Sequence, residues 1–411
     1  MSFQQGLSGL NAASKNLEVI GNNVSNSNTV GFKQSRAQFS DVYANSLTGS
    51  GSSQIGIGTK LSSVQQQFTQ GNVSSTNNPL DIAINGGGFF RMSNNGTVTY
   101  SRNGQFQMDK LGYIVDSENK RLTGYSANSS GNLSTGAPAD LNINTADLVP
   151  KTTSSTKGLF NLDSRDATKT VASFNPNDPT TYNHSSAVSV YDSLGNSHTI
   201  QSFFVKTAPG TWSLLTTADG VPTAYTPPAT PVATAQLVFS GTGIQPTITP
   251  ATPNVAFAVT TGASAMSINV DYSGSTQFGS NFSVNSMSQD GYTSGRLSGF
   301  NTGADGTIIG RYTNGQSSVL GQVVLANFTN PNGLQSLGSN TWAESSTSGS
   351  PLIGAPNSGS LGVLQSSAVE DSNVDLTAEL VNMITAQRIY QANAQTIKTQ
   401  DQVLQTLVNL R

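Results

Sequence analysis

The two histidines, His184 and His198, are the first candidates for acid–base or metal chemistry, because imidazole titrates near neutral pH. They stand fourteen residues apart, each among Ser, Thr and Asn. A zinc site or a Ser–His pair needs several such groups to converge, and the sequence has no third histidine and no cysteine. We therefore expect both to be surface or hydrogen-bonded histidines.

Two short strings resemble catalytic or phosphate-binding motifs. Ser154-Ser-Thr-Lys157 matches an S-x-x-K pattern, but it lies in a Ser/Thr-rich tract where such strings arise by chance. Gly86-Gly87-Gly88 precedes aromatic residues rather than a helix that could cradle a phosphate, so it indicates a bend. The sequence thus predicts a protein that is not an enzyme and has no cofactor or metal site.

The charge content is low for a chain of 411 residues. Only 10% of residues are charged, against about 25% in an average soluble protein. Lys plus Arg number 19 and Asp plus Glu 22, giving a net charge of −3 without any basic run. Because nucleic-acid binding requires a basic surface, we expect no nucleic-acid partner.

No targeting or membrane segment is recognisable. The first basic residue is Lys15 and no long apolar stretch follows the start, so a cleavable secretory signal is not expected. No segment has the roughly 20 apolar residues needed to cross a bilayer, so membrane insertion is not expected. Export would require a route that does not read such a signal.

The elements around which the chain is organised are its two ends. Residues 372–411 contain neither Gly nor Pro, and Ser372 with Asp375 is a serviceable helix start. Steps of four and three from Leu376 make a heptad seam. The predicted contact residues of this helix are Leu376, Leu380, Met383, Ile384, Tyr390, Ala394, Ile397, Leu404, Leu407 and Val408.

The other end repeats the four-three spacing. Its predicted contact residues are Phe3, Leu7, Leu10, Leu17, Ile20 and Val24. A single long amphipathic helix cannot repay the entropy of ordering its backbone, so each end needs a partner. The plain alternative is a pair of core helices in an ordinary monomer.

Between the ends the pattern is mostly β, so we expect a mixed, mostly β fold with the two helices paired in a coiled-coil-like inner domain. Asn103-Gly104 and Asn314-Gly315 are predicted hairpin loops, and the Pro-rich stretch 222–253 is predicted to be loop. The predicted organisation is an N-terminal helix (1–30), a connector (31–71), a β-rich middle domain in two parts (72–147 and 289–368), an inserted outer β domain (148–288) and a C-terminal helix (369–411).

Three groups of motifs resemble the rod and hook axial proteins of the bacterial flagellum. The first is Leu10-Asn-Ala-Ala-Ser-Lys-Asn-Leu17 with Gly31-Phe-Lys33, and the second is Asn78-Pro-Leu-Asp-Ile-Ala-Ile84 with Tyr100-Ser-Arg-Asn-Gly-Gln-Phe106. The third is Ser372-Asn-Val-Asp-Leu376 with Tyr390-Gln-Ala-Asn393. Rod-type members lack a large insertion, and Val188-Ser-Val-Tyr-Asp-Ser-Leu-Gly195 with Trp212 resembles the outer domain of hook-type members, so the hook type is favoured.

The resemblance implies a structural subunit that self-assembles into a flexible, hollow helical tube, a universal joint passing torque from rod to filament. It also implies export through the flagellar type III apparatus to an extracellular hook. The implied partners are further copies of the chain, the distal rod, the hook cap, the hook–filament junction proteins and a hook-length control protein. The alternatives are a distal rod-type axial protein, a secreted β-sandwich adhesin or carbohydrate-binding module, and a hydrolase with an unobvious site.

Overall fold

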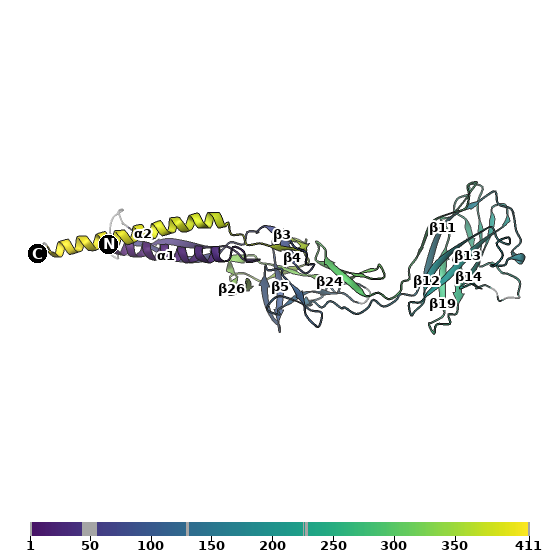
Figure 1. The fold of residues 1–411 in the computed structure, drawn as a ribbon, viewed down its shortest axis with the longest axis horizontal. Coiled ribbons are helices and arrows are strands. Elements are labelled where there is room, and N and C mark those ends of the chain that lie inside the picture. Colours follow the sequence, from purple (N-terminus) through teal and green to yellow (C-terminus); the bar gives the residue numbers. More distant parts are fainter. Residues whose placement is uncertain (1, 43–55, 129–130, 225, 227–228, 410–411) are drawn as a thin grey trace. The chain divides into compact units, whose positions relative to one another are not determined.

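The computed structural model describes residues 2–42, 56–128, 131–224, 226 and 229–409 (Figure 1). The chain divides into two compact units. The first unit comprises Met1–Thr145, Gly299–Arg311 and Ser317–Arg411, and the second comprises Ala146–Ser298 and Tyr312–Gln316. The predicted insertion, 148–288, lies within the second unit. The chain enters this unit after Thr145 and leaves its main segment after Ser298.

Two terminal helices lie side by side in the first unit: α1 (Ser2–Ser25) and α2 (Leu376–Asn409) (Figure 1). They run antiparallel, because Gly6 of α1 lies against Ile397 and Gly9 lies against Asn393. The predicted helix start at Ser372 is wrong. Asp375 caps α2 instead, since its Oδ1 accepts hydrogen bonds from the N–H groups of Thr377 (2.9 Å) and Ala378 (3.1 Å).

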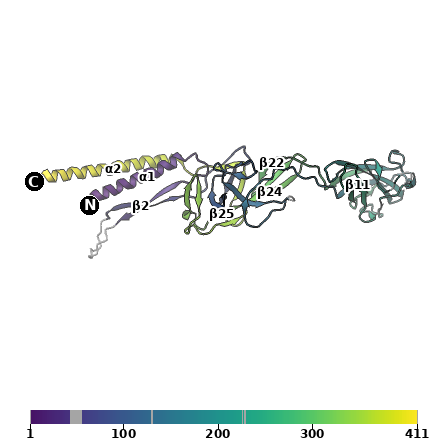
Figure 2. The same cartoon turned by 90° about the horizontal axis from the view of Figure 1, so that it is seen from below.

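The predicted connector after the first helix is in part a hairpin. Its strands are β1 (Ser35–Val42) and β2 (Gly58–Gln66), paired antiparallel with a bulge after Gln38. Figure 2 shows β2 running alongside α1, which it contacts. A two-stranded ribbon is marginal in water, so this hairpin depends on the helix for support.

The β part of the first unit is a thirteen-stranded sheet with two small two-stranded sheets beside it. The main path runs β22-β23-β24-β9-β5-β6-β27-β26, while β29 pairs with β4 and β3 with β30. The strands are β3 (Val73–Ser75), β4 (Ile82–Asn85), β5 (Phe89–Asn94), β6 (Thr97–Ser101), β7 (Gln107–Met108), β8 (Ile114–Val115), β9 (Arg121–Ser126), β10 (Ala139–Asp140), β22 (Leu297–Thr302), β23 (Thr307–Tyr312), β24 (Ser317–Val323), β25 (Leu325–Asn327), β26 (Gln335–Gly338), β27 (Thr341–Ala343), β28 (Leu352–Gly354), β29 (Val363–Ser366) and β30 (Ala368–Glu370), with a 3-10 turn at Pro331–Gly333.

One of the two predicted hairpin loops is wrong. Asn95-Gly96, not Asn103-Gly104, joins two paired strands: Asn94 pairs with Thr97, and both loop residues have positive φ, 49° and 91°. This is the type I′ geometry that an Asn-Gly pair favours. The Gly104 carbonyl instead accepts a hydrogen bond from Ile82 N–H, so that segment leaves β6 and crosses toward β4. The hairpin around Asn314-Gly315 is confirmed, since β23 pairs with β24.

The second unit consists of a five-stranded and a six-stranded sheet. Large side chains such as Phe160, Phe204 and Trp212 share one buried cluster. The strands are β11 (Ser155–Asp163), β12 (His184–Tyr191), β13 (Ser197–Ala208), β14 (Thr211–Ala218), β15 (Val221–Pro222), β16 (Ala235–Val238), β17 (Thr247–Thr249), β18 (Asn254–Phe257), β19 (Met266–Asp271), β20 (Thr276–Phe278) and β21 (Ser283–Gln289), with a 3-10 turn at Val171–Ser173.

The prediction that 222–253 is only loop is wrong, because β16 and β17 lie within it. Ala235 and Leu237 alternate with exposed neighbours and point into the buried cluster, a period-two signal that the surrounding Pro and Thr concealed. The Gly/Ser-rich passage between that stretch and Asp290 likewise contains β18 to β21.

Candidate assembly surface

The two terminal helices approach closely because α1 carries small residues where they meet. A Cβ added at Gly9 would lie 2.7 Å from Asn393 Oδ1, and one added at Gly6 would lie 3.1 Å from Ile397 Cγ1. Ala13 and Ile20 of α1 and Ala386 of α2 are buried. A side chain larger than hydrogen at Gly9 would therefore push the helices apart.

The predicted contact residues divide into two groups in the structure. Ile20 is buried, and Leu10, Leu17, Val24, Met383, Ala394 and Ile397 are half-buried. Exposed residues are Phe3, Leu7, Leu376, Leu380, Ile384, Tyr390, Leu404 and Val408. The side chain of Leu407 lies outside the described part of the chain.

The exposed group shows that α2 has a second apolar face. Glu379, Ala386 and Asn393 recur every seven residues on the side that meets α1. At about 100° per residue, Leu376, Leu380 and Ile384 lie roughly 50°, 100° and 150° around the helix from that line, all on the same side of it. Leu376 and Leu380 are each 44% exposed and Ile384 is 52% exposed. The residues predicted to form one seam thus lie on two faces of α2. One face packs against α1, and the face with Leu376, Leu380 and Ile384 is exposed.

The C-terminal end of α2 extends beyond α1 (Figure 1). Gly6 lies level with Ile397, so the described residues after about 401 have no partner helix alongside. Val403, Leu404 and Val408 are exposed there. An isolated helix end with three exposed aliphatic side chains is marginal in water and gains from association.

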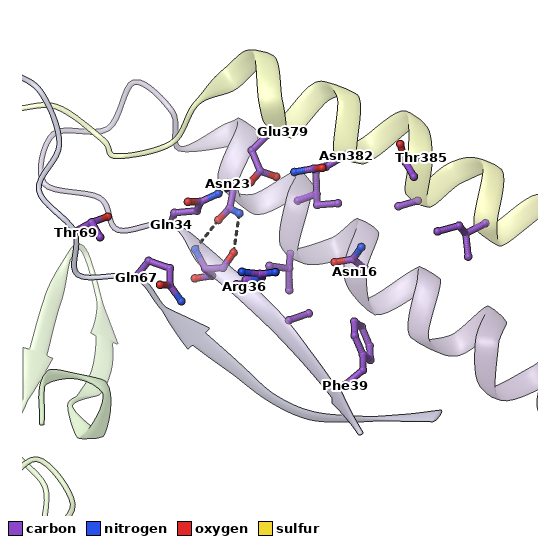
Figure 3. Close-up of a pocket in the computed structure, with 16 residues that line it drawn as sticks. Asn16, Asn23, Gln34, Arg36, Phe39, Gln67, Thr69, Glu379, Asn382 and Thr385 are labelled. Atoms are coloured by element: carbon purple, nitrogen blue, oxygen red, sulfur yellow. Dashed lines mark hydrogen bonds between the residues drawn. The ribbon is translucent and has the colours of Figure 1, made fainter. Parts of the chain in front are cut away.

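A cavity of about 600 Å³ lies between α1, α2 and β1 (Figure 3). Asn16, Gln34, Arg36, Asn382 and Thr385 line it with polar groups. Phe39 and Ile389, which are partly exposed, add apolar surface. The helix pair and the hairpin therefore enclose a recess that their own side chains leave unfilled.

Asn23 fixes the hairpin to α1 at one end of this cavity. Its side chain is 1% exposed; Nδ2 donates to Ser35 O (2.8 Å) and Oδ1 accepts from Ser35 N–H (2.9 Å), as Figure 3 shows. Gln34 Nε2 donates to a carboxylate oxygen of Glu379 on α2. The start of β1 is thereby tied to both helices.

A buried charge node joins the terminal segments to the β part of the first unit. Glu370 accepts from Lys33 Nζ (2.6 Å) and from an Arg102 guanidinium nitrogen (3.0 Å), and all three side chains are at most 4% exposed. Lys33 Nζ also donates to Thr69 O (2.8 Å). Burial lowers the pKa of Lys33 and outweighs the opposing effect of Glu370. Burial likewise lowers the pKa of Arg102.

Neighbouring contacts extend this node. Asn373 Oδ1 accepts from Gln34 N–H (2.7 Å), and its Nδ2 donates to Gln67 O (2.8 Å). Gly31, at φ 72°, lies so close to the backbone of Asn103 that an added Cβ would be 2.6 Å from its nitrogen. The segment after α1 and the segment before α2 are therefore held in fixed positions relative to each other.

Sequence reasoning missed the node residues as functional groups. Lys33 and Arg102 belong to the motifs Gly31-Phe-Lys33 and Tyr100-Ser-Arg-Asn-Gly-Gln-Phe106, but no role was predicted for either side chain. Glu370 lies just before the third motif. An isolated Lys, Arg or Glu carries no local signal of burial. The available hint was their proximity to recognisable motifs in a chain with few charges.

The candidate chemical groups do not form a reactive site. Ser154 Oγ donates to Asp290 (2.7 Å), while Lys157 lies 3.6 Å from Asp271, so the two bind different carboxylates. His184 is 2.6 Å from Asp166 and stacks on Phe282. Within the described ranges, no group of three or more His, Asp or Glu residues could hold a metal ion. Neither α1 nor α2 is sufficiently apolar along its described length to cross a membrane.

Comparison with known proteins gives relatives along the full chain. The flagellar hook protein FlgE of Salmonella typhimurium is 44% identical, and that of Escherichia coli K12 is 41% identical, with 100% of both chains covered. FlgE of Borreliella burgdorferi is 31% identical over 100% of this chain and 99% of its own. The crystal structure of Helicobacter pylori flagellar hook protein FlgE2 matches with a TM-score of 0.53 at 14% identity, covering 72% of this chain and 100% of that one, and so shares its fold.

Family models match four successive stretches. They are the flagella basal body rod protein (3–33), the flagellar hook protein FlgE/F/G D1 domain (83–159), the flagellar basal body protein FlaE D2 domain (161–292) and the flagellar basal body rod FlgEFG protein C-terminal region (365–410). With the paired terminal helices, they define an axial structural protein of the bacterial flagellum, a subunit that polymerises and is not an enzyme. Within that class, the chain belongs to the flagellar hook protein family. Its location is the flagellar hook.

Proposed function

We propose that the second apolar face of α2, formed by Leu376, Leu380 and Ile384, is the surface through which copies of this chain associate into a hollow helical tube. The observation that carries the proposal is the exposure of these three residues on a helix whose opposite side already contacts α1. These side chains are about half covered already, so burying the rest of each contributes about 0.7–1.5 kcal/mol, and this gain recurs at every subunit. Such a tube is a flexible joint passing torque from rod to filament.

The cavity between α1, α2 and β1 and the unpaired end of α2 support the same proposal. A neighbouring helix supplies side chains for the recess beside Phe39 and Ile389. It also covers Val403, Leu404 and Val408. Three other exposed contact residues, Phe3, Leu7 and Tyr390, are available to further copies.

The family resemblance extends the proposal to specific partners and to an export route. The tube would begin on the distal rod, grow beneath a hook cap, end at the hook–filament junction proteins and be measured by a length-control protein. The subunits would pass unfolded through the flagellar type III apparatus to an extracellular position. Marginal terminal helices suit this route, because they order fully only after association.

The test is a triple variant, Leu376→Gln, Leu380→Gln and Ile384→Gln. Leu and Gln have similar helix propensities and Gln exceeds Ile, so the helix itself persists while its apolar face is lost. We expect sedimentable polymer to fall at least tenfold, with unchanged fluorescence from the buried Trp212 and Trp342. The matched control replaces the exposed Gln391, Gln395 and Gln402 by Ala. Polymer yields equal to those of the unmodified chain would refute the assignment of this face.

A further inference from the structure

His198 occupies an unusual position in the second unit. Its Nδ1 lies 2.7 Å from Asp219 Oδ2 and its Nε2 lies 3.3 Å from Asp192 Oδ2. A neutral imidazole has one N–H and one acceptor nitrogen, so only the imidazolium can donate to both carboxylates. The ring is 7% exposed, and the side chain of Asp192 is fully buried. The three side chains form a cluster that we call the brace.

The brace organises the turn between β12 and β13. Asp192 Oδ1 accepts from the N–H groups of Leu194 (2.8 Å) and Asn196 (2.9 Å). Its Oδ2 accepts from Asn196 Nδ2 (2.9 Å) and Thr261 Oγ1 (2.8 Å), in addition to His198. Turn 192–196 is therefore shaped by a single carboxylate, to which His198 contributes one of five hydrogen-bond contacts.

This turn lies against the two segments through which the chain enters and leaves the second unit. Gly195 has φ 86°, and a Cβ there would lie 3.0 Å from Pro150 Cβ and 3.3 Å from Ser294 N. From here on, the connector means residues 148–151 and 292–295, which are a different segment from the predicted connector 31–71. Its strands pair through Leu148 N–H to Gly295 O (2.8 Å), Lys151 N–H to Tyr292 O (3.0 Å) and the reciprocal bonds.

We propose that the brace is a pH-sensitive device that holds turn 192–196 against the connector while His198 is charged and releases it when the ring loses its proton. Deprotonation leaves one ring nitrogen without a hydrogen to donate, facing a carboxylate. That loss loosens the turn, and the paired connector then opens more often. The connector lies within the second unit, beside the points where the chain enters and leaves it.

The direction of the pH effect follows from the groups around the ring. Burial alone would lower the pKa of His198, but hydrogen bonds to Asp219 and Asp192 outweigh it and raise that pKa above 6.5. The pKa of Asp219 is lowered and that of Asp192 is well below its usual range, because hydrogen-bond donors outweigh their burial. From β18, the neutral ring of Phe257 packs edge-on against the imidazole, with the two ring centroids 6.0 Å apart. The stabilisation is complete below the unfolded pKa and is lost as pH rises through the raised pKa.

The experiment is amide hydrogen exchange on the full chain, read at Leu148, Lys151, Tyr292 and Gly295 from about pH 5.5 to 8.5 and corrected for intrinsic exchange. We expect protection of these amides to fall about fivefold as His198 deprotonates. In His198→Gln, protection should be low and independent of pH. A proton NMR titration gives the His198 midpoint, with His184 as the second resonance for comparison.

Two further variants keep the test decisive should His198→Gln fold poorly. Asp219→Asn removes one carboxylate whose side chain is 51% exposed, and should shift the protection loss to lower pH. Gly195→Ala should lower connector protection at every pH, whereas Gly96→Ala, with similar positive φ but no neighbour within 4 Å, should not. A midpoint at or below 6.5, or an unchanged pH response in both His198→Gln and Asp219→Asn, would overturn the proposal.

Discussion

At the scale of single residues, Glu370 has the greatest structural consequence. It accepts from Lys33 and Arg102, which are 337 and 268 residues away in sequence. No local pattern could have revealed this convergence, because the spacing exceeds any helical or strand period. The node binds the segment after α1, the start of β3 and the segment before α2 into one structure.

Glu370→Gln is predicted to destabilise the first unit by about 3–5 kcal/mol, because two buried cations lose their counter-charge. Urea unfolding followed by Trp342 fluorescence in a Trp212→Phe background measures this, since Trp342 is in the first unit. Lys33→Met, which leaves a balanced Arg102–Glu370 pair, should cost less. Glu18→Gln at the exposed Lys15–Glu18 pair should cost under about 1 kcal/mol. Equal losses for Glu370→Gln and Glu18→Gln would contradict the role of the node.

At the scale of elements, the sequence predicted the existence of α1 and α2 because neither end is interrupted by proline and both show helical periodicity. It could not divide the apolar residues of α2 between two partners. Periodicity marks Leu380 and Ile397 alike, yet Ile397 packs against Gly6 of α1 while Leu380 is 44% exposed. The β1–β2 hairpin was missed because its strands are polar and mostly exposed. Asn95-Gly96 lies only eight residues before Asn103-Gly104, and the dipeptide alone does not distinguish the two as loops; the strand pairing does.

The close approach of the helices predicts a sharp difference between two glycines of α1. Gly9→Val should force α1 away from Asn393, lower the helical circular dichroism signal of the termini and reduce polymer yield at least fivefold. Gly21→Val introduces the same β-branched side chain on the same helix, where no described atom beyond the adjacent backbone of α1 itself lies within 4 Å of the added Cβ. Its effect should be confined to a few tenths of a kcal/mol of helix propensity. Matching losses in both variants would show that close helix contact at Gly9 is unimportant.

At the scale of the whole molecule, the sequence predicted the mostly β class and the family but not the later strands of the inserted region, β16 to β21. Strands β16 to β21 are short and rich in Ser, Thr and Asn, so their buried members are too few to dominate the local composition. Low charge suits a subunit whose contacts rearrange, since few desolvated ion pairs must break. Under our proposal, the terminal helices are the assembling element and the β units keep their fold during assembly.

The most direct measurement is negative-stain electron microscopy of the full-length chain beside a form lacking residues 1–25 and 376–411, both under polymerising conditions. Fluorescence of Trp212 and Trp342 confirms that the β units of the shortened form remain folded. We predict hollow tubes from the full-length chain and folded monomers from the shortened one. Tubes from both forms would contradict the central claim that α1 and α2 are the assembling element.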